Sequence, residues 1–87
     1  MATQEDLMAL SNAGIDINEG RAMVAQGGAR ITAGLITIQR VNKGNPSHTL
    51  TQCQNKCHEA SAMAGRIVLA VEGADGLLRE YLIKMVS

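Results

Sequence analysis

The chain has 87 residues, of which one, Tyr81, is aromatic, and its eight basic and eight acidic residues give a formal net charge of zero. A domain this small buries a limited share of its surface and usually depends on aromatic side chains, disulfides or metals. The balanced charge argues against a general nucleic-acid or membrane-surface binder. We therefore expect neighbouring subunits to supply part of the burial.

Neither a membrane span nor a secretory leader is expected. The longest nearly uninterrupted apolar run, residues 63–71, contains Arg66 and is much shorter than the roughly 20 residues that cross a bilayer. The N-terminal residues have no basic segment leading into an apolar one, so they do not resemble a cleaved secretory signal.

Charge is unevenly distributed along the first half of the chain. Residues 1–20 carry four acidic and no basic side chains, whereas residues 21–43 carry four basic and no acidic ones. The pattern has two interpretations: head-to-tail complementarity between subunits, or an acidic, solvated N-terminal segment that favours a helix start.

The first half is expected to form an arm and a helix. Apolar residues near position 8 could begin a helix that glycines at 14 and 20 interrupt, so residues 1–18 are expected to be a flexible or short helical arm. Residues 19–43 are expected to be helix 1, because apolar or small residues recur at helical spacing. These are Val24, Gly28, Ile31, Leu35 and Ile38. The β-branched run at residues 36–38 leaves a strand as the alternative.

A turn is expected at residues 44–48, where Gly44, Asn45 and Pro46 follow one another. Residues 49–87 are expected to be helix 2, with Ser47 or Thr49 as its N-cap. Its stripe alternates steps of three and four, as in a coiled-coil seam. The stripe comprises Leu50, Cys53, Cys57, Ala60, Ala64, Ile67, Val71, Ala74, Leu78, Tyr81 and Met85.

Helix 2 also has apolar residues off this stripe, and a helix that is apolar on several faces needs contacts on several sides. Gly65, Gly73 and Gly76 lie within it, and each costs about 1 kcal/mol relative to alanine. Close packing against another helix would offset that cost; the alternative is a break at Gly73–Gly76 that gives three helices.

Cys53, Cys57 and His58 form the cluster that most resembles a ligand set, since two thiolates and an imidazole can bind zinc. His58 points about 100 degrees away from Cys57, a fourth ligand is missing, and both cysteines lie on the apolar stripe, where cysteine acts as a small hydrophobe. We expect no metal, cofactor or enzymatic activity, with a metal- or thiol-dependent enzyme as an alternative. Cysteines four apart on a helix are too distant for a disulfide, so reduced thiols are expected.

The sequence Gly44-Asn45-Pro46-Ser47, followed by about 40 residues of helix, resembles the needle and inner-rod subunits of type III secretion systems and their flagellar rod-base relative. The resemblance implies a helical hairpin, export without a cleaved signal to a surface or envelope-spanning apparatus, and assembly with the C-terminal helix near the channel. It also implies copies of the chain, a cytosolic chaperone and other secretion-apparatus proteins as partners.

The sequence thus predicts an all-α helical hairpin that assembles into a helical oligomer, as the structural subunit of a secretion-type needle, rod or tube. The alternative function is a non-polymerising helical-hairpin binding module, such as a small secreted effector, a chaperone or a type VII-like exported protein. The residues expected at interfaces are Gly28, Ile31, Leu35, Ile38, Ala60, Ala64, Ile67, Val71, Ala74, Leu78, Tyr81 and Met85.

Overall fold

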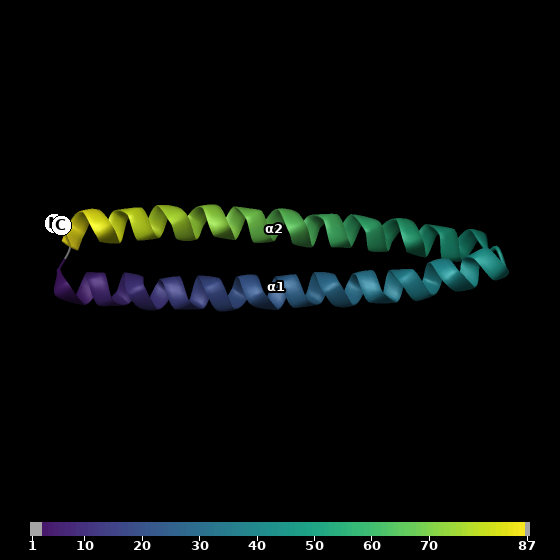
Figure 1. Cartoon of the computed structure of the whole chain (residues 1–87), viewed down its shortest axis with the longest axis horizontal. Helices are drawn as coiled ribbons and strands as arrows, with labels where there is room; N and C mark the ends of the chain where they lie inside the picture. Colours follow the sequence, from purple (N-terminus) through teal and green to yellow (C-terminus); the bar gives the residue numbers. More distant parts are fainter. Residues whose placement is uncertain (1–2, 87) are drawn as a thin grey trace.

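The protein is a hairpin of two long helices. The structure is a computed structural model, in which residues 3–86 are described. Helix α1 spans Gln4–Gly44 and helix α2 spans His48–Val86, and the two pack antiparallel, side by side (Figure 1). The rod measures 63 × 15 × 14 Å, and no described residue lies in a strand. The expected all-α hairpin is confirmed, and residues 36–38, the alternative strand, are helical.

Helix α1 begins at Gln4, well before the expected start at residue 19. The Thr3 hydroxyl accepts a hydrogen bond from the Asp6 amide at 3.1 Å, and the Asp6 carboxylate accepts one from the Thr3 amide at 3.1 Å. This capping box satisfies amides that a helix start leaves unpaired. Residues 4–18 are therefore the first turns of α1 and not a separate arm, whereas residues 1 and 2 of the expected arm lie outside the described part.

The two helices are joined by a link of three residues, 45–47, inside the expected turn. Gly44 is the last residue of α1. Asn45 leaves the helical conformation, with φ −143° and ψ 78°, as expected for a residue that precedes a proline. Pro46 thus ends α1 through the conformation of its neighbour.

Hydrogen bonds then start α2 at His48. The Asn42 side-chain oxygen accepts a bond from the Ser47 amide at 2.8 Å, and the Ser47 hydroxyl accepts one from the Leu50 amide at 3.3 Å. Ser47, one of the two expected caps, is therefore the residue that caps α2.

The face of α1 that meets α2 alternates steps of three and four residues, the spacing of a coiled-coil seam. The partly or fully buried residues in these steps are Leu7, Leu10, Gly14, Ile17, Arg21, Val24, Gly28, Ile31, Leu35, Ile38 and Asn42. The expected stripe from Val24 to Ile38, which includes the interface candidates Gly28, Ile31 and Leu35, lies within this seam.

On α2 the seam differs from the expected stripe at every second position. Its partly buried residues are Leu50, Gln54, Cys57, Ser61, Ala64, Val68, Val71, Asp75, Leu78 and Leu82, with Ala60 at its edge. The expected stripe residues Cys53, Ile67, Ala74, Tyr81 and Met85 are exposed instead. Three of these seam positions, Gln54, Ser61 and Asp75, hold polar side chains whose partners lie on α1, as described below.

Helix α2 runs without interruption through Gly73 and Gly76, so the alternative of three helices is wrong. A Cβ atom added at Gly65, Gly73 or Gly76 would meet no atom of the hairpin within 4 Å. These three glycines therefore do not bring α2 closer to α1.

The hairpin has almost no interior of its own. Among the described residues, Leu35 alone is buried, at 4% exposure. The chain exposes 6536 Å², whereas a compact monomer of 9.2 kDa exposes about 4,900 Å². Its surface is thus larger by roughly 1,600 Å², because two helices can bury only one narrow seam.

Candidate functional site

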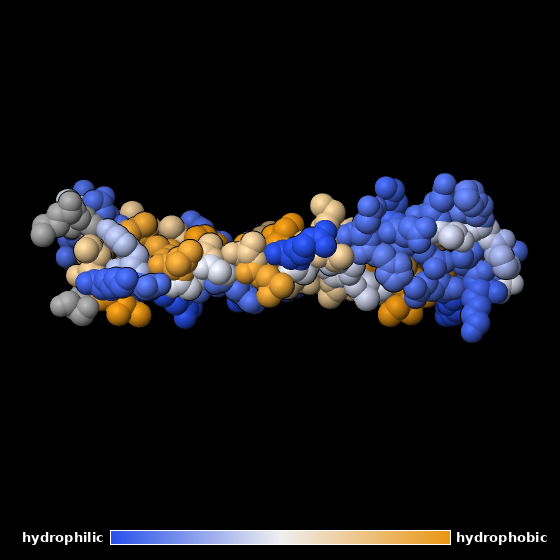
Figure 2. Space-filling model, turned by 90° about the horizontal axis from the view of Figure 1, so that it is seen from above, coloured by the Kyte–Doolittle hydropathy of each residue, from blue (hydrophilic) through white to orange (hydrophobic). Residues whose placement is uncertain are grey.

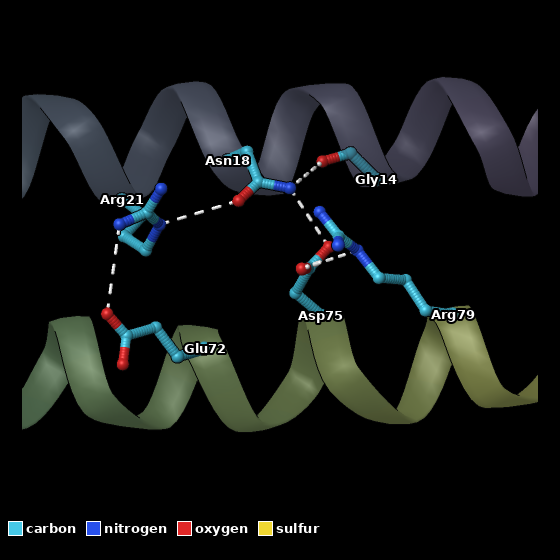
Figure 3. Close-up of polar contacts among 6 residues, drawn as sticks. All are labelled: Gly14, Asn18, Arg21, Glu72, Asp75 and Arg79. Carbon is cyan, nitrogen blue, oxygen red and sulfur yellow. Dashed lines mark hydrogen bonds and ion pairs between the residues drawn. The ribbon is translucent and has the colours of Figure 1, made fainter.

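A polar network crosses the seam near the termini (Figure 3). The Asn18 amide nitrogen donates to the Gly14 carbonyl and to the Asp75 carboxylate, both at 2.9 Å. The Asp75 side chain is 16% exposed and also pairs with Arg79 at 3.0 Å. Because each of these groups has a partner, the seam holds an amide and a carboxylate without leaving either unsatisfied.

Arg21 extends this network to the surface. Its Nε donates to the Asn18 side-chain oxygen at 3.4 Å, and its guanidinium lies 3.7 Å from the Glu72 carboxylate. Both charged side chains are more than a third exposed, so solvent screens this pair and its contribution to stability is small.

Two further polar layers lie between this network and the turn. The Thr32 and Ser61 hydroxyls are 2.8 Å apart. The Asn42 amide donates to Gln54 at 2.6 Å and to Thr51 at 3.1 Å. Polar partners in a seam meet in one register and lose their bonds in others, so the three layers fix how α1 and α2 align.

Two glycines let the helices approach each other: Gly28 lies between the Asn18 and Thr32 layers, and Gly14 lies at the Asn18 layer. A Cβ at Gly28 would lie 3.1 Å from the Ala64 Cβ, and one at Gly14 would lie 3.4 Å from Leu78 Cδ2. The other glycines of the hairpin would meet nothing within 4 Å. Gly28, an expected interface residue, therefore serves the contact between the two helices of one chain.

One broad side of the hairpin is a shallow groove, which we call the groove face. On each helix it consists of two rows of side chains that repeat every seven residues. The inner row of α1 is Ser11, Asn18, Ala25, Thr32 and Gln39, and the outer row is Met8, Ile15, Ala22, Ala29 and Ile36. Its rows on α2 are Thr51, His58, Gly65, Glu72, Arg79 and Asn55, Ala62, Leu69, Gly76, Ile83. Three open depressions of about 540, 570 and 350 Å³ lie along it, each lined by both helices.

The opposite broad side carries rows of glycine and alanine, and we call it the glycine face. Its rows on α1 are Ala13, Gly20, Gly27, Gly34, Val41 and Ala9, Asp16, Met23, Arg30, Thr37. Its rows on α2 are Cys53, Ala60, Ile67, Ala74, Tyr81 and Lys56, Met63, Ala70, Leu77, Lys84. The expected interface residues Ile67, Ala74 and Tyr81 lie here.

The two faces hold nearly all the exposed large hydrophobic side chains. Met8, Ile15, Ile36, Leu69 and Ile83 lie on the groove face, and Met23, Val41, Met63, Ile67, Leu77 and Tyr81 lie on the glycine face. The outer edges are mostly polar: Asn12, Glu19, Gln26 and Arg40 on α1, and Gln52, Glu59, Arg66 and Glu80 on α2. The molecule is therefore a slab with exposed hydrophobic side chains on both broad faces and mostly polar edges.

The two ends of the slab differ in charge and polarity. The terminal half, residues 3–24 and 68–86, has seven acidic and three basic residues, a net charge of −4. The turn half, residues 25–67, has five basic and one acidic residue, a net charge of +4. Figure 2 shows hydrophobic residues over the half near the termini and a hydrophilic surface at the turn.

Ion pairs within the chain accentuate this difference. The pairs are Arg21–Glu72, Arg79–Asp75, Lys84–Glu80 and Lys56–Glu59. The charged residues without an ion-pair partner among residues 3–86 are Glu5, Asp6, Asp16, Glu19, Arg30, Arg40, Lys43 and Arg66. The first four are acidic and lie in the terminal half; the last four are basic and lie in the turn half.

The cysteines occupy different environments. Cys57 lies in the seam and Cys53 is exposed on the glycine face, and both are free thiols. Partial burial, and then the neighbouring Cys53 thiol, raise the pKa of the Cys57 thiol above its usual value. A raised pKa lowers the thiolate fraction at neutral pH, and thiolate is the form that binds metals and attacks electrophiles.

The structure does not assemble the weak metal candidates Cys53, Cys57 and His58 into a site. No group of three His, Cys, Asp or Glu side chains that could hold a metal ion is found within residues 3–86. The His58 Nε2 atom instead lies 3.3 Å from the Gln39 side-chain nitrogen on the groove face. Over the same residues, neither helix has a stretch long and apolar enough to cross a membrane.

Comparison with known proteins leaves the two faces as the principal guide to function. No family model matches the chain, and no curated protein or solved structure matches it either.

Proposed function

We propose that the protein is a structural subunit whose copies pack together through the groove face and the glycine face. The observation that carries the proposal is the large hydrophobic surface left by a hairpin in which Leu35 is the one buried residue among those described. Large hydrophobic side chains that are exposed together on one face are characteristic of interaction surfaces.

The size of the exposed surface supports contacts on two sides. The chain exposes 6536 Å², roughly 1,600 Å² more than a compact monomer of its mass. A standard protein interface buries about 800 Å² on each partner. The excess therefore corresponds to about two such interfaces per subunit, which matches a slab with exposed hydrophobic side chains on two faces.

Use of both faces by every copy leads to extended assemblies. A subunit that uses two different faces for two different neighbours forms rings or helical filaments, depending on the rotation between neighbours. The resemblance of the turn and long C-terminal helix to type III needle and inner-rod subunits favours a rod or tube of the secretion type. Under this proposal the 63 Å hairpin is the repeating unit.

The alternative is a hairpin that binds one helix of a different protein. The groove face favours it, because one of its depressions, about 540 Å³, combines Leu10, Ile15 and Leu82 with the polar Asn18 and Arg79. An amphipathic helix lays its apolar side into such a groove.

Light scattering coupled to size-exclusion chromatography over a concentration series tests the proposal, with negative-stain microscopy of any large fraction. We expect concentration-dependent growth into rods or tubes. Leu77→Asp on the glycine face and Leu69→Asp on the groove face should each reduce this growth while circular dichroism shows unchanged helix content. Gln26→Asp on a polar edge is the matched control and should assemble normally.

A chain that remains monomeric throughout the series overturns the proposal. A chain that stops at a dimer excludes extended assembly and favours the binding module.

A further inference from the structure

The outer row of α1 on the glycine face has an internal two-fold pattern centred on Met23. Asp16 lies seven residues before Met23 and Arg30 lies seven residues after it, all three in one row along the helix. In the adjacent row, Gly20 lies three residues before Met23 and Gly27 four residues after it, so these two glycines flank nearly the same centre. If a second copy of α1 ran in the opposite direction, a glycine would therefore lie opposite a glycine and an acidic residue opposite a basic one.

These side chains have no role within the hairpin. Met23 is 71% exposed, and a Cβ at Gly20 or Gly27 would meet nothing within 4 Å. Asp16 and Arg30 are exposed and have no ion-pair partner among residues 3–86. The pattern therefore needs an explanation outside the single chain.

We propose that two copies of the chain pack antiparallel through their glycine faces, α1 against α1, about a two-fold axis beside Met23. The inference rests on the proposed self-association and adds its face, direction and register. A two-fold interface is self-complementary, because each residue meets the residue that lies equally far on the other side of the axis. The four helices of the two hairpins then form one bundle.

The charges of α1 favour the antiparallel direction. In this register Asp16 of each copy faces Arg30 of the other, which gives two equivalent ion pairs. Asp6 of one copy and Arg40 of the other, each 17 residues from Met23, lie at matching positions along the paired helices, nearer to the ends of the pair. A parallel, in-register pair would place the acidic halves together and the basic halves together, and like charges across an interface are unfavourable.

The small residues allow the helices to come close. Gly20 of one copy lies beside Gly27 of the other, and Ala13 lies beside Gly34, so no bulky side chain separates the two α1 backbones in this row. In the outer row, Met23 of one copy lies beside Met23 of the other copy at the axis. Close approach of this kind increases the van der Waals contact between helices.

The same axis also pairs α2 with α2, because α1 and α2 are held in one register by their polar layers. By the same pairing of like rows, Met63 is brought near Leu77 of the second copy and Ile67 near its Ala74. Alternation of large and small residues lets facing rows interdigitate. Leu77 and Met63 are exposed in the single hairpin, so the contact removes hydrophobic surface from water.

Charge exchange tests the register. Asp16→Arg alone, or Arg30→Asp alone, converts two attractions per dimer into two repulsions and should raise the dimer dissociation constant by about tenfold. The double variant Asp16→Arg/Arg30→Asp restores both pairs with reversed sign and should return the constant to near the wild-type value. Sedimentation equilibrium measures all four proteins in a Leu69→Asp background, which disrupts the groove face and leaves the glycine-face dimer to be measured. Failure of the double variant to recover overturns the register.

Steric substitution tests the face. Gly27→Leu places a bulky side chain between the α1 helices and should weaken dimerisation by at least roughly 100-fold. Gly73→Leu is the matched control, because Gly73 lies on the polar edge of α2 and a Cβ there also meets nothing within 4 Å. Equal dimerisation of the two variants overturns the use of the glycine face.

Disulfide crosslinking tests the direction. Ala9 and Thr37 lie 14 residues before and after Met23 in the same row. In a Cys53→Ser/Cys57→Ser background, a chain with Ala9→Cys should crosslink to a differently tagged chain with Thr37→Cys. Crosslinking of each variant to itself instead of to the other overturns the antiparallel arrangement.

The outcomes separate this inference from the proposed function. A wild-type chain that does not self-associate overturns both. Assembly of the wild type together with failure of the register, face or direction tests overturns the inference alone.

Discussion

Gly27 and Gly28 are neighbours in the sequence, but the fold places them in opposite situations. A Cβ at Gly28 would lie 3.1 Å from the Ala64 Cβ, whereas one at Gly27 would meet nothing within 4 Å. Gly28 therefore serves the contact between α1 and α2, and Gly27 has no packing role in the single chain. Whether a glycine within a helix serves helix packing therefore depends on the face of the helix on which it lies.

The same comparison extends to two other residue types. Asp75 lies in the seam and is hydrogen-bonded, whereas Asp16 is exposed on the glycine face without an ion-pair partner among residues 3–86. Cys57 lies in the seam and Cys53 on the glycine face. Each pair offers one residue type in both environments, so matched substitutions compare the seam with the glycine face directly.

The largest difference is expected for the two glycines. Gly28→Leu forces the helices apart at Ala64 and should lower the free energy of unfolding by about 3 kcal/mol. Gly27→Leu should raise it by about 1 kcal/mol, because leucine is a better helix former than glycine and the site is open in the single chain. Urea unfolding followed by circular dichroism, at a concentration where the chain is monomeric, measures both. Similar stabilities for the two variants would contradict the assignment of their rows.

A smaller difference is expected for the two aspartates. Asp75→Ala removes the partner of Asn18 and of Arg79, and should cost about 1–2 kcal/mol relative to Asp16→Ala. Both positions are in helix interiors, so the gain in helix propensity from alanine is the same and cancels in the comparison. The measurement is again urea unfolding of the monomer, and equal stabilities would show that the polar layer contributes little.

The sequence predicted the seam of α1 better than that of α2, for a physical reason. The α1 stripe from Val24 to Ile38 is apolar or small at every position, so its periodicity identifies the buried row. On α2 the true seam includes Gln54, Ser61 and Asp75, whereas the neighbouring row with Ile67 and Tyr81 is more apolar. Periodicity selects the more apolar row, and the polar residues are recognised as buried only once their α1 partners are known.

The sequence does not predict the start of α1, for a related reason. Gly14 and Asn18 are weak helix formers, but Gly14 lies against Leu78 and Asn18 bonds to Asp75, so contacts with α2 stabilise this part of the helix. One local signal was present: Thr3 and Asp6 have the spacing of a capping box. The two-fold pattern around Met23 was also visible in the sequence, but it has meaning only when α1 extends without a break through residues 13–34.

The cysteine pair gives the smallest expected effect, a difference in reactivity between the seam and the glycine face. Because the pKa of Cys57 is raised in the folded chain, its thiolate forms at higher pH than in the unfolded chain, and alkylation at a given pH is slower until urea unfolds the protein. Iodoacetamide labelling across a pH series, with peptide mass spectrometry of each cysteine, measures this.

For Cys53 we expect a different dependence: labelling should slow as protein concentration rises, because self-association covers the glycine face. Gly27→Leu should abolish that protection of Cys53 while leaving the pH dependence of Cys57 unchanged. Protection that persists in Gly27→Leu would place Cys53 in another contact.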